Sequence, residues 1–478
     1  MTTSNCCHAS ESARAPDIAV IGAGSAGFAA AIRAAELGAR VALIGHGTLG
    51  GTCVNIDCVP SKTLIRAAEA LHGGRAAARF AGIDGATRLR DWSALATQKD
   101  ALVASLRQAK YTDVLKAHER ISYRQGRARI VGTGLTVGDE TMAPVRIVIA
   151  TGAAPSRPAI AGLETVPWLD STGALALRRL PASLLVVGGG FVGCELGQMF
   201  ARAGVAVTIV CRSRLMPQAE PEIGAALADY LRAEGIDVRC GAAYEAVEGD
   251  TAGVALTLRT ADGRPDAVRA ERLLVAAGRR PNTAGLGLAE AGIATDARGA
   301  IHVDDRLRTT RPGIYAAGDV TGRDMFVYMA AYGGKIAAEN ALNGDSRCYD
   351  NAAMPEVVFT DPQIATVGLT EAAARAKGFN VETSLIGLDQ VPRALAARDT
   401  RGLVKLVAER RSGRLLGAHM LAPEAGDSIQ TATLAIKQGM TASDLAETVF
   451  PYLTTVEALK LAALGFTKDV AALSCCAG

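Results

Sequence analysis

Aromatic residues make up only 4% of this sequence, and neither sign of charge dominates it, because the formal net charge is +3 over 478 residues. No block of lysine and arginine is long enough to suggest a nucleic-acid groove. Glycines and charged residues interrupt every strongly apolar stretch, and the polar N-terminus has no apolar segment of a secretory signal. The composition therefore predicts a cytoplasmic protein with no nucleic-acid partner and no membrane span.

Glycine is abundant, at 52 residues, and apolar residues make up 49% of the chain. A chain of this length is too long for one core, so we expect two to four domains. Frequent glycines suit the tight turns of an α/β protein. The ten cysteines do not resemble the disulfide framework of a small secreted protein, and they favour redox chemistry, metal chemistry or simple burial.

Two segments have the pattern of a strand, a glycine turn, a helix and a second strand. The first is "DIAVIGAGSAGFAAAIRAAELGARVALIG", and the second is "SLLVVGGGFVGCELGQMFARAGVAVTIVCRSR". In the first we expect strands at 17–21 and 40–44 around a helix at 29–37. In the second we expect strands at 183–187 and 205–210 around a helix at 191–203. The fold class is therefore α/β with two Rossmann-like dinucleotide-binding domains.

The first turn contains Gly22, Gly24 and Gly27. The first glycine of such a turn permits the bend, the second lets a pyrophosphate approach the backbone, and the third lets the helix pack on the strand. An acidic residue that would bind a ribose is expected at the end of the second strand, but Gly45 and His46 stand there. A glycine turn of some other α/β domain is the alternative.

The second turn contains Gly188, Gly190 and Gly193. Its second strand ends in Arg212 and Arg214 instead of a carboxylate, and two arginines suit a 2′-phosphate. This favours NADP over NAD, although two solvated surface arginines are the alternative. Two dinucleotide units predict two cofactors.

A carboxylate follows the strand in "IYAAGDV", where Asp319 is placed to meet the ribityl hydroxyls of a flavin. FAD in the first unit and NADPH in the second are the cofactors that we expect. From residue 352 onward the pattern changes to antiparallel strands followed by helices between 428 and 463, which predicts a separate α+β domain.

Cys53 and Cys58 lie in "GGTCVNIDCVPSK", directly after the first unit. A zinc site needs four ligands, usually as two close pairs. The other two cysteine pairs, Cys6–Cys7 and Cys475–Cys476, are adjacent in sequence and lie at the two ends of the chain, which argues against such a site. Electron exchange with a flavin is the better interpretation, and the positive charge of Lys62 favours a thiolate there.

These motifs, with "ATG" and "AAGD", resemble the flavoprotein pyridine nucleotide-disulfide oxidoreductases, which have the glutathione reductase architecture. The resemblance implies a homodimer with this order along the chain: a disordered tail at 1–15, the first part of an FAD-binding domain at 16–154, an NADPH-binding domain at 155–280, the second, central part of the FAD-binding domain at 281–348, a C-terminal α+β dimerisation domain at 349–466, and a tail with a cysteine pair at 467–478.

The same resemblance implies roles for single residues. Cys58 is expected beside the flavin, with Cys53 as the exchanging thiol, and Lys62 is expected near the flavin and paired with Glu195. It also implies that Phe191 covers the nicotinamide site and that Gly47, Thr52 and Val327 contact the FAD. Gly45 departs from the family pattern, so the sequence leaves open how the FAD ribose is held.

Thiol-reducing members need a general acid, since a sulfur leaving group must be protonated. They carry a His-Pro step, but this chain has Phe450 before Pro451 in "FPYLTTVEALKLAA" and ends in "LSCCAG". Together with "RQAKYTDVL", these stretches resemble the mercuric reductase branch, in which two tyrosines and a C-terminal cysteine pair act on Hg(II). The corresponding residues are Tyr111, Tyr452, Cys475 and Cys476.

We therefore expect NADPH-dependent reduction of thiol-ligated Hg(II) to Hg(0), with Cys53, Cys58, Cys475 and Cys476 as the metal-binding cysteines. Three alternatives remain: a lipoamide- or glutathione-type disulfide reductase, an NADPH oxidase, and a non-catalytic thiol protein that binds the metal.

Nothing in the sequence assigns the other cysteines a role in the reaction. The N-terminal Cys6 and Cys7 are either a remnant of a metal-catching arm or incidental thiols, because too few residues precede 17 for a metal-binding domain. The rest lie in or beside apolar segments and are most simply buried: Cys194, Cys211, Cys240 and Cys348.

Overall fold

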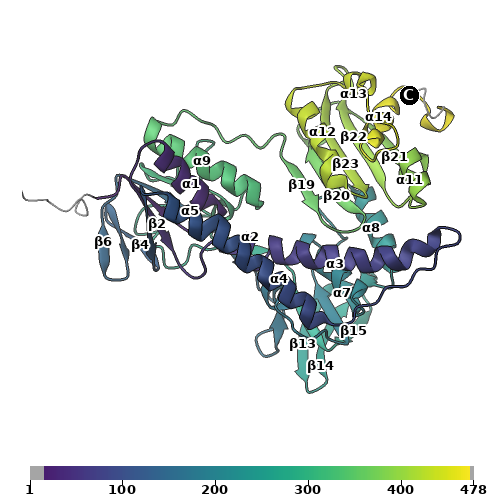
Figure 1. Ribbon diagram of the computed structural model, residues 1–478, viewed down its shortest axis with the longest axis horizontal. Coiled ribbons are helices and arrows are strands. Elements are labelled where there is room, and N and C mark those ends of the chain that lie inside the picture. Colours follow the sequence, from purple (N-terminus) through teal and green to yellow (C-terminus); the bar gives the residue numbers. More distant parts are fainter. Residues whose placement is uncertain (1–14, 474–478) are drawn as a thin grey trace, which may run out of the picture. The chain divides into compact units, whose positions relative to one another are not determined.

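The computed structural model describes residues 15–473, which form two compact units that alternate along the chain (Figure 1). Of the described residues, unit 1 contains 15–55, Leu102–Ala154 and Arg279–Tyr349. Unit 2 contains Ile56–Ala101, Pro155–Gly278 and 350–473. Three of the points at which the chain passes from one unit to the other lie within two residues of the domain boundaries that we expected. The segment 56–101 belongs to unit 2, whereas we expected it in the first part of the FAD-binding domain.

Unit 1 is built on a five-stranded parallel sheet with strand order β18-β7-β1-β2-β3. Its strands are β1 (Ile18–Ile21), β2 (Val41–Gly45), β3 (Ile121–Gln125), β7 (Arg146–Ile149) and β18 (Ile314–Ala316). The strand β1 is buried throughout, as expected for the centre of a parallel sheet. The expected strand–turn–helix–strand order of the first segment is confirmed.

Two helices of unit 1, α1 (Ser25–Glu36) and α9 (Val327–Asn343), lie side by side (Figure 1). Small residues allow this approach, since a Cβ added to Gly334 would lie 2.2 Å from the carbonyl oxygen of Ala26. The other elements of unit 1 are α2 (Gly51–Ile56), α5 (Asp113–Ala117), β4 (Ala128–Val131), β5 (Gly134–Val137), β6 (Glu140–Met142), β8 (Ala153–Pro155), β17 (Arg279–Pro281), and the short helix η4 (Asp319–Thr321).

The dinucleotide-type part of unit 2 has a second five-stranded parallel sheet, with strand order β12-β11-β10-β16-β9. Its strands are β9 (Trp168–Leu169), β10 (Ser183–Val187), β11 (Ala206–Val210), β12 (Asp237–Arg239) and β16 (Arg272–Val275). An antiparallel meander follows, made of β13 (Ala243–Asp250), β14 (Gly253–Arg259) and β15 (Pro265–Ala270). The helices are α3 (Cys58–Ala76), α6 (Ser171–Leu175), α7 (Phe191–Arg202) and α8 (Pro221–Ala233).

A helix connects the two units along the chain. It is α4 (Trp92–Arg107), which continues as a π-helical turn, η3 (Gln108–Thr112).

The C-terminal part of unit 2 is the expected α+β domain, with an antiparallel sheet ordered β19-β20-β23-β22-β21. Its strands are β19 (Pro355–Val358), β20 (Gln363–Gly368), β21 (Val381–Gly387), β22 (Leu403–Glu409) and β23 (Leu415–Ala422). Its helices are α10 (Glu371–Ala376), α11 (Pro392–Ala397), α12 (Ala425–Lys437), α13 (Ala442–Glu447) and α14 (Glu457–Leu464). The predicted fold class is confirmed in all three parts.

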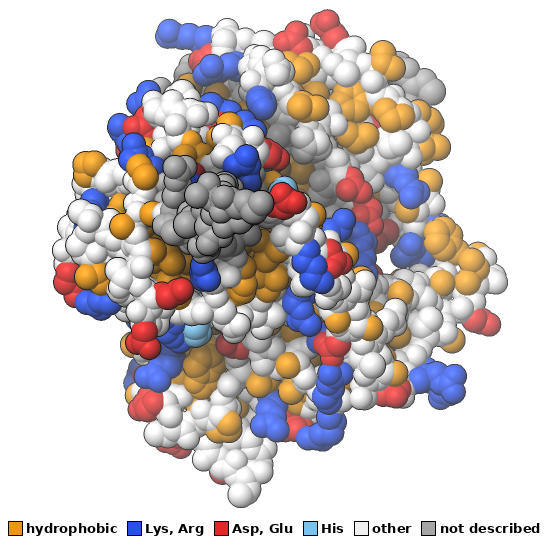
Figure 2. All heavy atoms as spheres, turned by 60° about the vertical axis from the view of Figure 1, so that its left-hand side comes forward, with side chains coloured by type: hydrophobic (Ala, Val, Ile, Leu, Met, Phe, Trp, Pro, Cys, Tyr) orange, Lys and Arg blue, Asp and Glu red, His pale blue; other side chains and the backbone are white. Residues whose placement is uncertain are grey.

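The described surface mixes both signs of charge. On the face drawn in Figure 2, basic and acidic side chains are interspersed with apolar ones. Within residues 15–473, no helix combines the length and hydrophobicity that crossing a bilayer requires.

Candidate dinucleotide and redox site

The first glycine turn joins β1 to α1 in the conformation that its sequence predicts. Gly22 has φ +123°, and a Cβ there would lie 2.1 Å from the carbonyl oxygen of Ala150. A Cβ on Gly27 would lie 1.7 Å from the carbonyl oxygen of Gly22. Only glycine fits both places, and the turn leaves the amino end of α1 with backbone N–H groups for a phosphate.

Several predicted FAD contacts gather around this turn at the carboxyl edge of the sheet. The amide of Gly50 donates to the carbonyl oxygen of Ala23 at 3.0 Å, so the segment that carries Thr52 packs on the turn. Asp319 opens η4 directly after Gly318, whose added Cβ would lie 3.1 Å from the Cβ of Ala26. Asp319 also lies 3.9 Å from the Nε of Arg279.

Two more predicted contacts lie on exposed surface of unit 1. Val327 is the first residue of α9 and is 37% exposed. Gly47 follows β2 with φ +86° and has open space where a Cβ would stand. The structure therefore brings the turn, the Gly50–Thr52 segment and Asp319 together, and it leaves room beside Gly47 for a ligand.

Tyr123 explains the missing acidic residue at Gly45, and sequence reasoning did not find it. A Cβ on Gly45 would lie 2.7 Å from the Tyr123 hydroxyl and 2.8 Å from the Cβ of Ala23. Tyr123 comes from β3, which pairs with β2 in parallel. Its hydroxyl therefore occupies the space that a longer side chain at Gly45 would need, and burial raises the pKa of this phenol.

Tyr111 lies on the π-helical turn η3 within unit 1. Its ring contacts Phe28 edge to face, with ring centroids 4.7 Å apart. A Cβ on Gly50 would lie 3.1 Å from the same ring. The π-turn thus positions Tyr111 against the glycines that precede Cys53 in the chain.

The two motif cysteines have different helical positions. Cys53 lies in α2 of unit 1, Cys58 is the first residue of α3 in unit 2, and both are half-buried. The amino end of a helix carries partial positive charge, which stabilises negative charge on the sulfur of Cys58.

The expected pairing of Lys62 with Glu195 is confirmed within unit 2. The Lys62 ammonium lies 2.6 Å from Oε2 of Glu195, whose side chain is only 7% exposed. The other oxygen, Oε1, accepts from the amide of Phe359 at 2.9 Å. The ammonium also lies 4.7 Å from the centre of the Phe359 ring. These contacts fix a cation on α3 one turn after Cys58.

The second glycine turn repeats the geometry of the first. Gly188 has φ +125°, and a Cβ there would lie 2.3 Å from the carbonyl oxygen of Ala276. A Cβ on Gly193 would lie 2.0 Å from the carbonyl oxygen of Gly188, whereas Gly190 faces open space. Phe191 begins α7 and lines a cavity of about 280 Å³ within unit 2.

The two predicted phosphate-binding arginines differ in their surroundings. Arg212 follows β11 and is exposed. The guanidinium of Arg214 donates to three carbonyl oxygens of its own loop, those of Met216, Pro217 and Ala219, at 3.0, 2.9 and 2.7 Å. Arg214 therefore holds the loop, and Arg212 is the cation that faces solvent.

In the segment "FPYLTTVEALKLAA", Phe450 packs partly against the core of the α+β domain, and Tyr452 is 48% exposed. Glu457, the acidic partner in this motif, is buried and accepts from the amide of Leu453 at 3.3 Å. The pair Cys475 and Cys476, like Cys6 and Cys7, lies outside the described residues.

The remaining cysteines are only partly as expected. Cys194 and Cys211 are buried, and Cys240 is half-buried. The prediction that Cys348 is buried is wrong: it is exposed, because it lies in the loop after α9.

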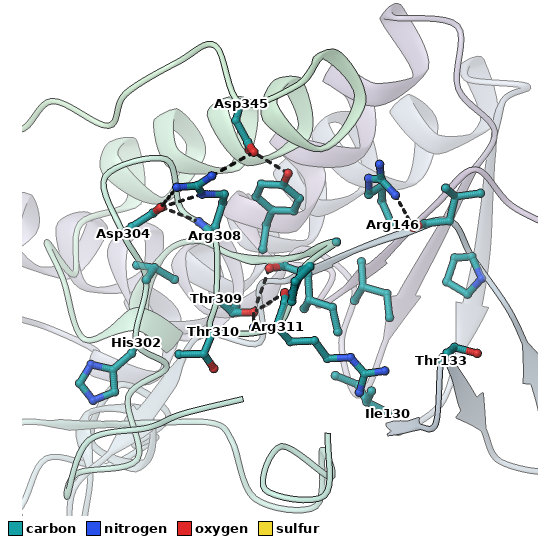
Figure 3. A pocket seen from close by; sticks show the side chains of 18 of the residues that line it. Ile130, Thr133, Arg146, His302, Asp304, Arg308, Thr309, Thr310, Arg311 and Asp345 are labelled. Atoms are coloured by element: carbon teal, nitrogen blue, oxygen red, sulfur yellow. Dashed lines mark hydrogen bonds and ion pairs between the residues drawn. The ribbon is translucent and has the colours of Figure 1, made fainter. Parts of the chain in front are cut away.

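A larger cavity of about 1010 Å³ lies at the opposite, amino edge of the unit 1 sheet (Figure 3). Its arginines are already engaged, since Arg308 is held between Asp304 and Asp345 and Arg311 donates to the carbonyl oxygen of Ala291. Ligands of parallel α/β sheets bind at the carboxyl edge, where the glycine turn is, so this cavity is not the dinucleotide site.

The chain is similar to known proteins over almost its whole length. It is 50% identical over 468 residues to the mercuric reductase of Streptomyces lividans, covering 97% of this chain and 98% of that protein. It is 47% identical over 469 residues to the mercuric reductase of Shigella flexneri, covering 96% of this chain and 82% of that protein.

A solved structure, the Cu(II) complex of the HOCl-induced flavoprotein disulfide reductase RclA from Escherichia coli, is 31% identical. It matches with a TM-score of 0.83, over 95% of this chain and all of that one. Residues 16–334 match the pyridine nucleotide-disulphide oxidoreductase family, and residues 354–463 match its dimerisation domain. With its two glycine turns and its C-terminal domain, the chain belongs to the pyridine nucleotide-disulphide oxidoreductases, which are flavoprotein oxidoreductases.

Proposed function

We propose that this protein is a mercuric reductase, a homodimer that reduces thiol-ligated Hg(II) to Hg(0) with NADPH in the cytoplasm. Each turnover takes two electrons from NADPH and yields NADP⁺, a proton and Hg(0). The observation that supports this most is Phe450, which stands where a disulfide reductase of this architecture needs a proton donor. A phenyl ring cannot protonate a sulfur leaving group, whereas reduction of a bound metal ion requires no such proton.

The residues of unit 1 fit an FAD. The glycine turn and the amino end of α1 would hold the pyrophosphate, while Thr52, Gly47, Asp319 and Val327 would contact the rest of the cofactor. We propose that the Tyr123 hydroxyl takes the ribose contact that a carboxylate at Gly45 would otherwise make. When bound, FAD supplies transfer of an electron pair from the nicotinamide to the thiol site.

The residues of unit 2 fit an NADPH. The turn at Gly188, Gly190 and Gly193 would hold its pyrophosphate, and Phe191 would cover its nicotinamide site. Arg212 would bind the 2′-phosphate, with Arg214 keeping the loop in place through its three carbonyl contacts. The Lys62–Glu195 pair would hold a positive charge beside the redox centre, where it stabilises the anionic reduced state.

The cysteines would act in sequence on the metal ion. Cys475 and Cys476 of the partner subunit would take Hg(II) from its thiol ligands and pass it to Cys53 and Cys58 by ligand exchange. Thiolates suit this role because they bind soft metal ions strongly and exchange by attack of another thiol. Tyr111 and Tyr452 would steady the ion or help to displace competing ligands.

The test is NADPH oxidation in excess thiol, with and without Hg(II), together with collection of volatile mercury. Wild type should oxidise NADPH in response to Hg(II) and release Hg(0). The double variant Cys475→Ala/Cys476→Ala should lose this response with bulky thiol adducts, and Cys348→Ala, a matched exposed cysteine, should keep it.

The alternatives predict different results in the same assay. A disulfide reductase would turn over a disulfide substrate faster than Hg(II). An oxidase would consume NADPH with oxygen alone and ignore Hg(II), and a metal-binding protein would bind Hg(II) stoichiometrically without volatile product. Any of these outcomes would overturn the proposal.

A further inference from the structure

Cys211 and Cys240 directly follow two neighbouring parallel strands of unit 2, β11 and β12. β11 and β12 pair in register up to Val210 and Arg239, so these cysteines are the next opposed residues. The regular ladder ends there, where the amide of Cys211 donates to the carbonyl oxygen of Arg239 at 2.9 Å and the amide of Ala242 donates to the carbonyl oxygen of Cys211 at 3.0 Å. The two sulfurs are 3.5 Å apart.

This placement meets the geometric requirement of a disulfide. Neighbouring strands lie about 4.7–4.9 Å apart, and disulfide-linked Cα atoms usually lie about 4.4–6.8 Å apart. Closing the sulfurs to the bonded distance of about 2.05 Å needs side-chain rotation and little backbone movement.

The two thiols are unequal in access and in charge. Cys211 is 4% exposed, whereas Cys240 is half-buried and is the more exposed residue of the two. The Cys211 thiol donates a hydrogen bond to the sulfur of Cys240 and lowers the pKa of Cys240 to about 6, with help from the backbone of Leu215 and the charge of Arg232. The same interaction, together with burial, raises the pKa of Cys211. This arrangement provides a nucleophilic thiolate and a resolving thiol next to it.

The pair adjoins the second glycine turn. A Cβ on Gly189 would lie 2.9 Å from the Cβ of Cys211 and 3.1 Å from its sulfur. The thiol of Cys194 lies 3.6 Å from the carbonyl oxygen of Gly189 on the same turn. Cys211 therefore lies beside the turn and directly before the exposed Arg212 in the chain.

We propose that Cys211 and Cys240 form a second redox pair, oxidised to a disulfide by peroxide, and that this disulfide weakens dinucleotide binding at the second glycine turn. The Cys240 thiolate attacks the peroxide O–O bond, giving a sulfenic acid and releasing hydroxide, which is protonated to water. The Cys211 thiol then attacks the sulfenic sulfur, the S–S bond forms, and a second water leaves. Two thiols lose two electrons and one peroxide gains them.

A disulfide fits this pair better than a metal ion does. A metal held between two thiolates keeps each sulfur about 2.3 Å from the ion, taking zinc as a guide, so a linear arrangement would push these sulfurs apart. Cys211 has little room for that movement, since it packs against the turn. Within the described residues, no group of three or more His, Cys, Asp or Glu side chains is placed to hold a metal ion.

The covalent half of the proposal is tested by peptide mapping of the full-length flavoprotein. The protein is reduced, desalted, treated with hydrogen peroxide, alkylated and digested with trypsin without reductant. Cleavage at arginines places Cys211 alone in peptide 203–212 and Cys240 alone in peptide 240–259. We expect these two peptides to become linked, the link to be absent in Cys240→Ser, and the link to persist in Cys348→Ala.

Three outcomes of the mapping would overturn this half. In one, Cys240 passes to the sulfinic acid without any link. In another, both peptides remain alkylated separately after peroxide. In the third, Cys211 is linked to the Cys194 peptide 180–202 instead.

The functional half is tested by calorimetric titration of NADP⁺ into the oxidised and the reduced protein. We expect oxidation to raise the dissociation constant about tenfold, which is within the range of coupling between linked sites, and dithiothreitol to restore it. Peroxide-treated Cys240→Ser should keep the affinity of its reduced form. An unchanged affinity in the linked wild type would overturn this half. Because no Hg(II) enters either experiment, their results are independent of whether the protein reduces Hg(II).

Discussion

The two glycine turns of this chain have nearly the same backbone and different surroundings. Their first glycines have φ +123° and +125°, and a Cβ added to their last glycines would lie 1.7 and 2.0 Å from the carbonyl oxygen of the first. The N-cap residues, Gly24 and Gly190, also agree, with φ and ψ of −95° and −169° against −88° and −170°. What differs is the residue at the carboxyl end of the second strand and what packs on it.

In the first unit that position is Gly45, against which Tyr123 is packed. In the second it is Cys211, which packs against the turn and is followed by exposed Arg212. The two glycine turns are thus nearly alike, as expected for two pyrophosphate sites. The neighbouring strand supplies the side chains that differ, and in the proposed function these distinguish the two dinucleotides.

The largest effects should come from substitutions that disrupt one glycine turn at a time. Gly27→Ala would put a Cβ 1.7 Å from a carbonyl oxygen, and Gly193→Ala would put one at 2.0 Å. Each should lower the free energy of unfolding by about 3 kcal/mol, at the upper end for overpacking. Gly27→Ala should purify without flavin absorbance, and Gly193→Ala should keep its flavin but lose reduction by NADPH. Loss of the same cofactor in both variants would contradict the assignment of the units.

Substitutions of the two arginines in the second unit should have different effects, one on the preference for NADPH over NADH and the other on the stability of the loop. Arg212→Ala should raise the KM for NADPH about 10- to 100-fold, as expected from loss of a charged hydrogen bond, while the KM for NADH changes little. Arg214→Ala removes three contacts to carbonyl oxygens, so it should instead lower the melting temperature. Steady-state kinetics with both nucleotides and thermal unfolding of both variants measure this. An equal loss with NADH in Arg212→Ala would argue against a 2′-phosphate contact.

The Tyr123 hydroxyl should have a smaller effect in the first unit. Tyr123→Phe should raise the FAD dissociation constant about fivefold, since a neutral hydrogen bond contributes about 1 kcal/mol. Tyr315→Phe is the matched control, because its hydroxyl donates to Asp345 at 2.9 Å at the amino edge of the same sheet. Fluorescence titration of the apoprotein with FAD measures both. A Tyr123→Phe protein with wild-type FAD affinity would leave the ribose contact to another residue.

The smallest expected effect is a shift in the pH dependence of cysteine alkylation near the second glycine turn. The thiolate is the reactive form, and it predominates above the pKa. Alkylation of Cys240 should therefore level off at a lower pH than that of an ordinary thiol, because its hydrogen bond with Cys211 lowers its pKa, whereas Cys194 should resist labelling, because burial raises the pKa of its thiol. Mass spectrometry of the two cysteine peptides gives both rates. A Cys240 rate that still climbs through about pH 8.5, as for an ordinary thiol, would contradict the lowered pKa.

The sequence alone determined the elements that depend on local spacing. The strand–turn–helix–strand segment that opens each dinucleotide unit and the antiparallel C-terminal domain are predicted from motifs, and the Lys62–Glu195 pair from the family resemblance. Local motifs succeed here because a glycine turn specifies its own backbone, through positive φ and close approaches that exclude any Cβ.

Only the tertiary structure decided which residues from distant segments meet. The order of strands places Tyr123 of β3 beside Gly45 and Cys240 beside Cys211, although many residues separate each pair in the chain. The folding of one loop decided that Arg214 binds carbonyl oxygens, and the path after α9 decided that Cys348 is exposed. Strand order and loop path are set by packing over the whole unit, so no short sequence pattern encodes them.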